Sequence, residues 1–144
     1  MLRFLCALSL VMGILLLPAQ AAEKPILLPL RIHTSSGEHN FMIEPALTPQ
    51  QQAKGLMGRT KMDDDYGMLF PISPPQPMTM WMENTLIPLD IVFIGPDRRI
   101  VRIVTGQPLD RTLLPSGGSV IAALELKGGI TKKLGIRAGD RVEW

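Results

Sequence analysis

The run LDIVFIG at residues 89–95 constrains the fold more than any other stretch of the chain. After Asp90, its side chains are apolar up to the closing glycine. Successive side chains of a strand point to opposite faces, so a run of this kind is typical of a central strand that is covered on both sides. The turn GPDRR, with proline at its first corner, then leads into a returning strand, IVRIVT. We therefore expect a sheet built around residues 89–95.

Other short runs predict further strands. LRIHT and HNFMIEP alternate apolar and polar residues and are joined by Ser-Ser-Gly, a pattern typical of a β-hairpin. Further strands are expected at GMLF (67–70), MTMWM (78–82) and VIAALEL (120–126), and a turn at AGD leads into the final RVEW (141–144). The proline-rich PISPPQP (71–77) is expected to form a stiff loop, and GQPLDRTLLPSGG (106–118) a long irregular one.

One segment has helical signals instead. Thr48 is a candidate N-cap, Pro49 suits the first helical position, and Gln51 completes a capping box. Gly58 is expected to end this helix after two to three turns. A second helical turn is expected in GGITKKLGI, closed by Gly135. The prediction is one mainly β domain with one or two short helices.

The first 21 residues have the order of a secretory signal: a basic start, an apolar run and the small residues Ala19-Gln20-Ala21. We expect cleavage after Ala21, with residues 22–144 forming a single domain that is periplasmic or secreted. A retained N-terminal anchor is the alternative. No second apolar span follows, so no stable membrane span is expected after cleavage. Cys6 lies inside the signal, which excludes a disulfide framework, a thiolate metal site and a cysteine nucleophile from the mature chain.

Several other classes of site lack their motifs. Acidic and basic residues are nearly balanced and scattered, so a nucleic-acid partner is not expected. MDDDYG lacks the alternating carboxylates of an EF-hand, SGGS is not a nucleophile elbow, and GGITKKLG is not a phosphate-binding loop. No cofactor and no metal site are expected.

Three methionines at alternating positions, Met78, Met80 and Met82, would share one face of a strand, with Trp81 on the other face. Aligned thioethers suit Cu(I), a soft ion. Methionine is also a common filler of irregular gaps in a core. We favour core packing and keep Cu(I) as the less favoured reading.

The following segment, ENTLIPLD, is the better candidate for function. Asn84 and Thr85 can both donate and accept hydrogen bonds, and Asp90 could orient them or act as a base. Asp90 could equally be a buried carboxylate that pairs with an arginine such as Arg59.

Five motifs, in order and spacing, resemble those of the domain of unknown function 192 family: GLMGR (55–59), GMLF (67–70), WMENTLIPLDIVFI (81–94), ALEL (123–126) and LGIRAGD (134–140). The resemblance implies a compact jelly-roll-like β-sandwich, and many members are exported or membrane-anchored. No activity is attached to the family as a whole. Glu83 stands where the family pattern usually has a basic residue, which weakens any site that needs a positive charge there.

These observations lead to three hypotheses of function. The first is a binding module for a small polar ligand, a saccharide or cell-envelope fragment, held by Arg59, Trp81, Asn84, Thr85 and Asp90. The second is an enzyme in which Asp90 acts as acid or base and Arg59 stabilises negative charge. The third is a structural or interaction protein whose motif is a buried polar latch. Catalytic residues are not assigned.

Overall fold

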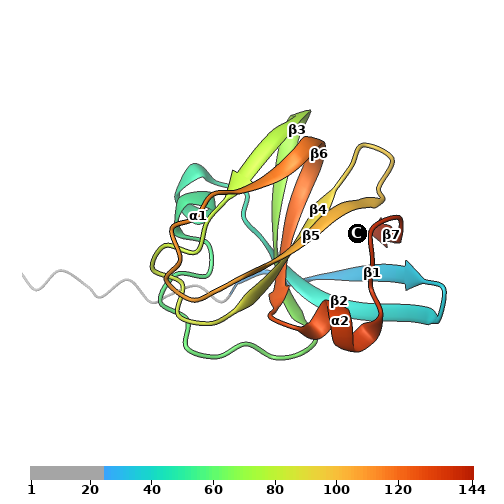
Figure 1. Ribbon diagram of the computed structural model, residues 1–144, viewed down its shortest axis with the longest axis horizontal. Helices are drawn as coiled ribbons and strands as arrows, with labels where there is room; N and C mark the ends of the chain where they lie inside the picture. The colour runs from blue at the N-terminus through green and yellow to red at the C-terminus, as the bar shows by residue number, and fades with distance from the viewer. Residues whose placement is uncertain (1–24) are drawn as a thin grey trace, which may run out of the picture.

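The computed structural model describes residues 25–144, so the expected signal segment lies outside the described residues (Figure 1). In chain order the elements are β1 (Leu28–Thr34), β2 (Gly37–Pro45), α1 (Pro49–Lys54), β3 (Tyr66–Met80), β4 (Leu89–Ile94), β5 (Ile100–Gly106), β6 (Leu114–Lys127), α2 (Ile130–Leu134) and β7 (Arg141–Glu143). Within this part of the chain, neither helix is long and apolar enough to cross a membrane.

All the strands belong to one seven-stranded sheet with the order β5-β4-β6-β3-β2-β1-β7. Neighbours are antiparallel except β2 and β3, which run parallel and are connected through α1. The predicted hairpin of β1 and β2 is confirmed, and so is the return from β4 to β5. Every residue of β4 is buried, as expected of a strand covered on both faces.

The sheet curls until its two edges meet. An isolated bridge pairs Arg99 with Arg141, although β5 and β7 stand at opposite ends of the strand order. The amide of Ile100 also donates to the carbonyl of Asp140 at 2.9 Å. In Figure 1, β1 and β2 run across the direction of β3 and β6. The mainly β prediction is confirmed, and the curled sheet is compatible with the sandwich-like form that the resemblance implies.

Two apolar cores lie on the two faces of this sheet. The inner core contains side chains from all seven strands and from α2, with Ile32, Val92 and Leu124 among them. The outer core involves β3, β4 and β6, and is covered by the segment between β2 and β3 through residues such as Leu56. Alternation along β4 and β6 assigns each side chain to one core or the other. The candidate site lies on the outer face.

The capping box of α1 is confirmed. The Thr48 side chain accepts from the amide of Gln51, and the Gln51 side chain accepts from the amide of Thr48. The helix is shorter than expected, because it ends at Lys54 with Gly55 as its cap and not at Gly58. Gly55 has φ 48° and ψ −135°, a conformation in which glycine avoids the steric cost of a side chain. The second helical turn, closed by Gly135, is confirmed.

The prediction of a proline loop at residues 71–77 is wrong. These residues belong to β3, which continues from Tyr66 to Met80 with shifts of register after Pro71 and after Pro77. β2 pairs only with the first part of β3, up to Leu69, so the proline segment has β6 as its single neighbour. Proline is tolerated on such an edge because its missing N–H is not needed there. The irregular loop 106–118 is likewise shorter than expected, because β6 begins at Leu114.

Candidate functional site

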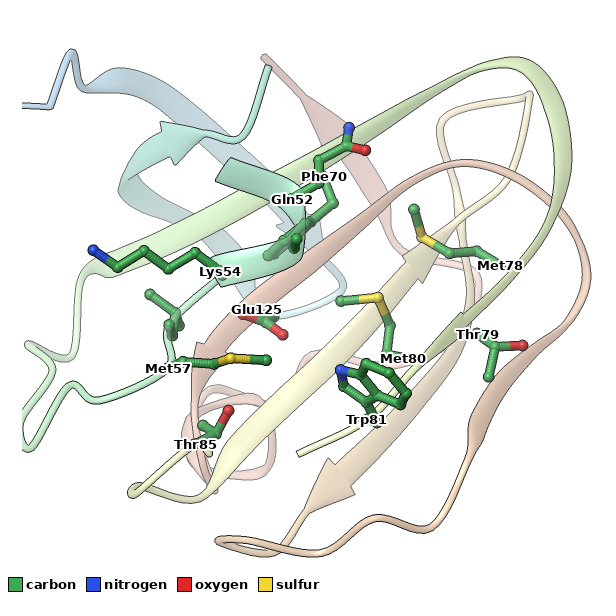
Figure 2. Close-up of a pocket in the computed structure, with 13 residues that line it drawn as sticks. Gln52, Lys54, Met57, Phe70, Met78, Thr79, Met80, Trp81, Thr85 and Glu125 are labelled. Atoms are coloured by element: carbon green, nitrogen blue, oxygen red, sulfur yellow. The ribbon is translucent and has the colours of Figure 1, made fainter. Parts of the chain in front are cut away.

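A pocket of about 300 Å³ opens on the outer face of the sheet, between α1 and the end of β3 (Figure 2). Apolar side chains make up most of its wall. Its lining consists of Gln52, Ala53, Lys54, Gly55, Leu56, Met57, Phe70, Met78, Thr79, Met80, Trp81, Thr85 and Glu125. The pocket therefore combines the end of α1, the end of β3, the loop before β4 and a single acid from β6.

Gly55 keeps one side of the pocket open. A Cβ atom at this position would lie 3.3 Å from the Phe70 ring and 3.9 Å from Oε2 of Glu125. The chain that leaves α1 is then held to the loop before β4, because the Gly58 amide donates to the carbonyl of Asn84 at 3.0 Å. The end of the helix and the loop before β4 thus form one connected rim.

Glu125 is the acid inside the pocket, and it is 5 % exposed. Its neighbours across the sheet are Met68 on β3 and Ile91 on β4, both apolar. Oε2 of Glu125 has no hydrogen-bond partner among the described residues. Burial raises the pKa of Glu125 to about 8, and the positive charge of Arg59 opposes this rise only in part. At neutral pH the free pocket therefore holds mainly a protonated carboxyl group.

Sequence reasoning missed Glu125 as a site residue. The signal was present, because Glu125 interrupts the otherwise apolar run VIAALEL. A charged residue inside a strand that is buried on both faces demands a partner or a function.

Trp81 and two methionines form the wall at the end of β3. Met78 and Met80 are half-buried, whereas Trp81 is 49 % exposed. β3 ends at Met80, so strand alternation does not separate Trp81 from the methionines as the sequence suggested. In Figure 2, Met57 and Met80 point toward the Glu125 carboxyl group from opposite sides, and the Lys54 amine points away from it.

Thr85 and Asn84 occupy different environments. Thr85 is buried and lines the pocket, where its hydroxyl makes a long hydrogen bond of 3.4 Å to the carbonyl of Glu83. Asn84 is exposed, has φ 55° and does not line the pocket. Its contribution is the left-handed turn and the backbone carbonyl that holds Gly58.

Arg59 does not pair with Asp90. Its guanidinium donates to the Glu44 carboxylate and, at 2.8 Å, to the Tyr66 hydroxyl, whose ring it also covers at 5.1 Å. Burial, reinforced by the hydrogen bond to Glu44, raises the pKa of Tyr66 to about 12. Arg59 is thus held between β2 and β3, beside the pocket but outside its lining.

Asp90 is fully buried and belongs to the inner face of the sheet. One carboxylate oxygen accepts from the Thr105 hydroxyl at 2.8 Å. The other accepts from the amide of Thr131 at 2.9 Å and from its hydroxyl at 2.7 Å. The expected pairing with Arg59 is wrong, because Asp90 already has three donors, on β5 and at the start of α2. Of the five proposed ligand-binding residues, the structure brings only Trp81 and Thr85 together in the pocket.

Of the three alternating methionines, Met82 is separated from the other two. Met82 follows the end of β3, is fully buried in the outer core and lies where a Cβ on Gly106 would clash with it. Met57, from the end of α1, joins Met78 and Met80 in the pocket instead. In residues 25–144 no group of three or more histidine, cysteine, aspartate or glutamate side chains is placed to hold a metal ion.

Two solved structures resemble this chain over most of its length. A protein of unknown function from Novosphingobium aromaticivorans DSM 12444 is 45 % identical, with a TM-score of 0.82 over 87 % of this chain and 90 % of that one. A protein from Sinorhizobium meliloti 1021, proposed to regulate transcription, is 38 % identical, with a TM-score of 0.81 over 85 % of this chain and 97 % of that one. A search among curated proteins finds no match.

A family model gives the broader assignment. The model of DUF192, described as an uncharacterised family, matches residues 31–144. This match covers the whole sheet except the first residues of β1, and it includes every residue of the pocket. The chain belongs to the DUF192 family.

Proposed function

We propose that this protein is a binding module for a small amphipathic molecule, which occupies the pocket between α1 and the end of β3. One observation carries the proposal: a buried Glu125, without a hydrogen-bond partner in the part of the chain that the structure describes, lies in a pocket whose wall includes a half-exposed Trp81. A concave, mainly apolar site with a few polar groups inside it is the usual form of a small-molecule site.

The energetic cost of Glu125 supports this proposal. A buried polar group without a partner destabilises a fold, and a buried carboxyl group does so strongly. Asp90 shows the ordinary structural solution in the same chain, since its carboxylate accepts three hydrogen bonds. Among residues 25–144 Glu125 has no such partners, and it faces a cavity that a ligand could fill. Strongly perturbed acids in clefts are typical of functional sites.

The chemistry of the pocket lining favours a less polar ligand than the saccharide expected from the sequence. Six of the thirteen lining residues have large apolar side chains: Leu56, Met57, Phe70, Met78, Met80 and Trp81. A saccharide presents hydroxyl groups in many directions, and this wall offers few partners for them. The proposed ligand therefore has an apolar body and one polar end, which reaches Glu125.

Nucleic-acid binding, which the description of the Sinorhizobium relative raises, has less support here. Several basic side chains form ion pairs with acidic ones: Arg111 lies 2.7 Å from Glu83, and Lys127 and Lys133 both contact Asp64. Paired charges do not form the basic stripe that a nucleic-acid surface needs.

Tryptophan fluorescence tests the proposed site directly, because the chain has two tryptophans. In a Trp144→Phe variant, Trp81 is the remaining reporter at the pocket, and in a Trp81→Phe variant Trp144 reports from the other core. A ligand found by thermal-shift screening of saccharides, envelope fragments, nucleotides, DNA duplexes and amphipathic small molecules is expected to change the emission of the first variant and not of the second.

The same screen gives a quantitative expectation. A ligand at a hundred times its Kd adds about 2.7 kcal/mol to the free energy of unfolding. We expect this gain to fall by at least half in Trp81→Ala, because stacking area is lost. Stabilisation that is equal in wild type and Trp81→Ala would place the ligand elsewhere and contradict the proposal.

We also propose that the protein works outside the cytoplasm, on the strength of the signal-like order of residues 1–21. After expression of the full chain, intact-mass analysis of the periplasmic or secreted fraction is expected to find a chain that begins at Ala22. Recovery of the uncleaved chain in the membrane fraction would instead support a retained anchor.

A further inference from the structure

We propose that the molecule bound in this pocket is a small organic cation, an amine with an apolar body, whose positive end pairs with Glu125 and whose body lies against Trp81. This inference rests on the proposed function, because it names the ligand class of the same pocket. Three features of the pocket support it: a carboxyl group without a counter-ion among the described residues, an aromatic face that no described cation covers, and a small volume.

The first feature is the missing counter-ion. Glu125 takes part in no ion pair among the described residues, and the two side chains that flank it in the sheet, Met68 and Ile91, are apolar. The neighbouring cations are committed elsewhere, since Arg59 donates to Glu44. The Lys54 amine points away from the carboxyl group (Figure 2). An ammonium group from the ligand would supply both the donor that Oε2 lacks and the missing positive charge.

The second feature is the free aromatic face of Trp81. Elsewhere in this chain aromatic rings attract cations: Arg59 lies over Tyr66 at 5.1 Å, and Arg98 lies over Trp144 at 4.4 Å. Within residues 25–144 no such contact involves Trp81, although its indole is half exposed at the pocket. Tryptophan offers the most favourable face for a cation. The thioethers beside it are polarizable and adapt to ligand shape.

The third feature is size. A volume of about 300 Å³ is at the lower end of the range for small-molecule sites. The conformation and position of Gly55 keep this volume open, since any Cβ there would approach Phe70. The pocket thus suits a compact amine with one ring or a short chain, and not an oligosaccharide or a peptide.

Binding of a cation should be coupled to the release of the proton from Glu125. Around Glu125, the segment after β2 contributes the positive charges of Lys54 and Arg59, while Glu44 and Tyr66 are engaged with that arginine. The adjacent strands contribute apolar side chains. Because burial raises the pKa of Glu125 to about 8, the free carboxyl group is mainly neutral at pH 6 and must lose its proton to pair with an ammonium. The affinity is therefore expected to rise about tenfold from pH 6 to pH 7 and to level off above pH 8.

Isothermal titration calorimetry of the mature chain tests this with a matched pair of probes. 2-Phenylethylamine carries an ammonium group throughout pH 6–8, and 2-phenylethanol has the same ring and chain without the charge. We expect the amine to bind more tightly than the alcohol, with close to one proton released per amine at pH 6, as measured in two buffers of different ionisation enthalpy.

Two variants test whether the proton release and the pH dependence come from Glu125. Glu125→Gln keeps the side-chain size and is expected to abolish both the proton release and the pH dependence. Asp64→Asn, which removes an exposed acid that does not line the pocket, should leave both unchanged. Equal binding of the alcohol and the amine without pH dependence would overturn the inference and leave the proposed function standing.

Two other results would also overturn it. One is the absence of amine binding. A hit of another class in the thermal-shift screen would then still support a binding module. A screen without hits would count against both the cationic ligand and the binding module. The other is Cu(I) binding in competition with a chelator that is lost in Met57→Leu or Met80→Leu, which would assign the pocket to a soft metal ion.

Discussion

A Glu125→Met variant is expected to be more stable than the wild-type chain at pH 8, by a margin that shrinks steadily as the pH falls to 5. The substitution replaces a buried carboxyl group by an apolar side chain of similar length between Met68 and Ile91, which are its neighbours across the sheet. The pH dependence is the informative part, because most other titrating groups are common to the two proteins and cancel in the comparison.

The direction in which stability changes with pH follows from proton linkage. Burial raises the pKa of Glu125 from 4.5 to about 8 in the folded protein, so between these values the folded chain holds a proton that the unfolded chain has lost. The stability of the wild type therefore falls as the pH rises from about 4.5 to 8. At about 1.4 kcal/mol per pH unit, the cost is about 3 kcal/mol at pH 7 and about 5 kcal/mol above pH 8. The variant avoids this cost.

Urea denaturation of both proteins at pH 5, 6, 7 and 8 measures the difference. Glu125→Gln is the second variant, since it is also neutral at every pH but keeps a polar group. A difference in the free energy of unfolding that stays constant over this range would show that Glu125 titrates normally. A more stable variant that has also lost the ligand would show that the acid is kept for binding and not for folding.

Asp90→Ala is expected to lower the free energy of unfolding by about 3–4 kcal/mol. The change leaves the amide and hydroxyl of Thr131 without their acceptor in a buried site, and each unsatisfied donor costs about 1–3 kcal/mol. Thr105 is exposed, so its hydroxyl turns to water instead. The latch between the sheet and α2 would be lost. The role is structural, so ligand binding by the folded fraction at low temperature should be unchanged.

Denaturation of Asp90→Ala beside Asp64→Ala provides the comparison between a buried and an exposed acid. Asp64 lies on the surface, where Lys127 and Lys133 lower its pKa to about 2. We expect little change in stability for Asp64→Ala. If Asp90→Ala folds as stably as the wild type but loses its ligand, the hypothesis that placed Asp90 in the binding site regains its support.

Features with local causes could be predicted from the sequence. The capping box of Thr48 and Gln51, the Ser-Ser-Gly hairpin and the closing Gly135 each depend on residues within a few positions of one another. The burial of β4 followed from its apolar run. The length of α1 was not predicted, because the sequence indicated Gly58 as its end and the backbone conformation of Gly55 ends the helix three residues earlier.

The missed features depend on pairing between distant segments. The proline segment of β3 reads as a loop locally, and it is a strand because β6 pairs with it on one side. The parallel pairing of β2 with β3 and the contact of the two sheet edges likewise have no local signal.

The candidate site was predictable only where its residues are close in sequence. Trp81 and Thr85 are close in sequence and do meet in the pocket. Arg59 and Asp90 were grouped by chemistry alone, and the sheet places them on different faces with partners of their own. Glu125 had a sequence signal, a charge within an apolar strand, but its pocket is completed by residues from α1 and β3 that only the fold brings near it.

The most direct test of the proposed binding site is the pKa of Glu125 itself, measured by carbon-13 NMR of the side-chain carboxyl groups and assigned by comparison with Glu125→Gln. A pKa near 8 in the free protein, which falls when a cationic ligand is added, is the result that a buried acid without a counter-ion predicts. A pKa near 4.5 that no ligand changes would show that Glu125 is already solvated or paired, and would contradict the assignment of this pocket as the binding site.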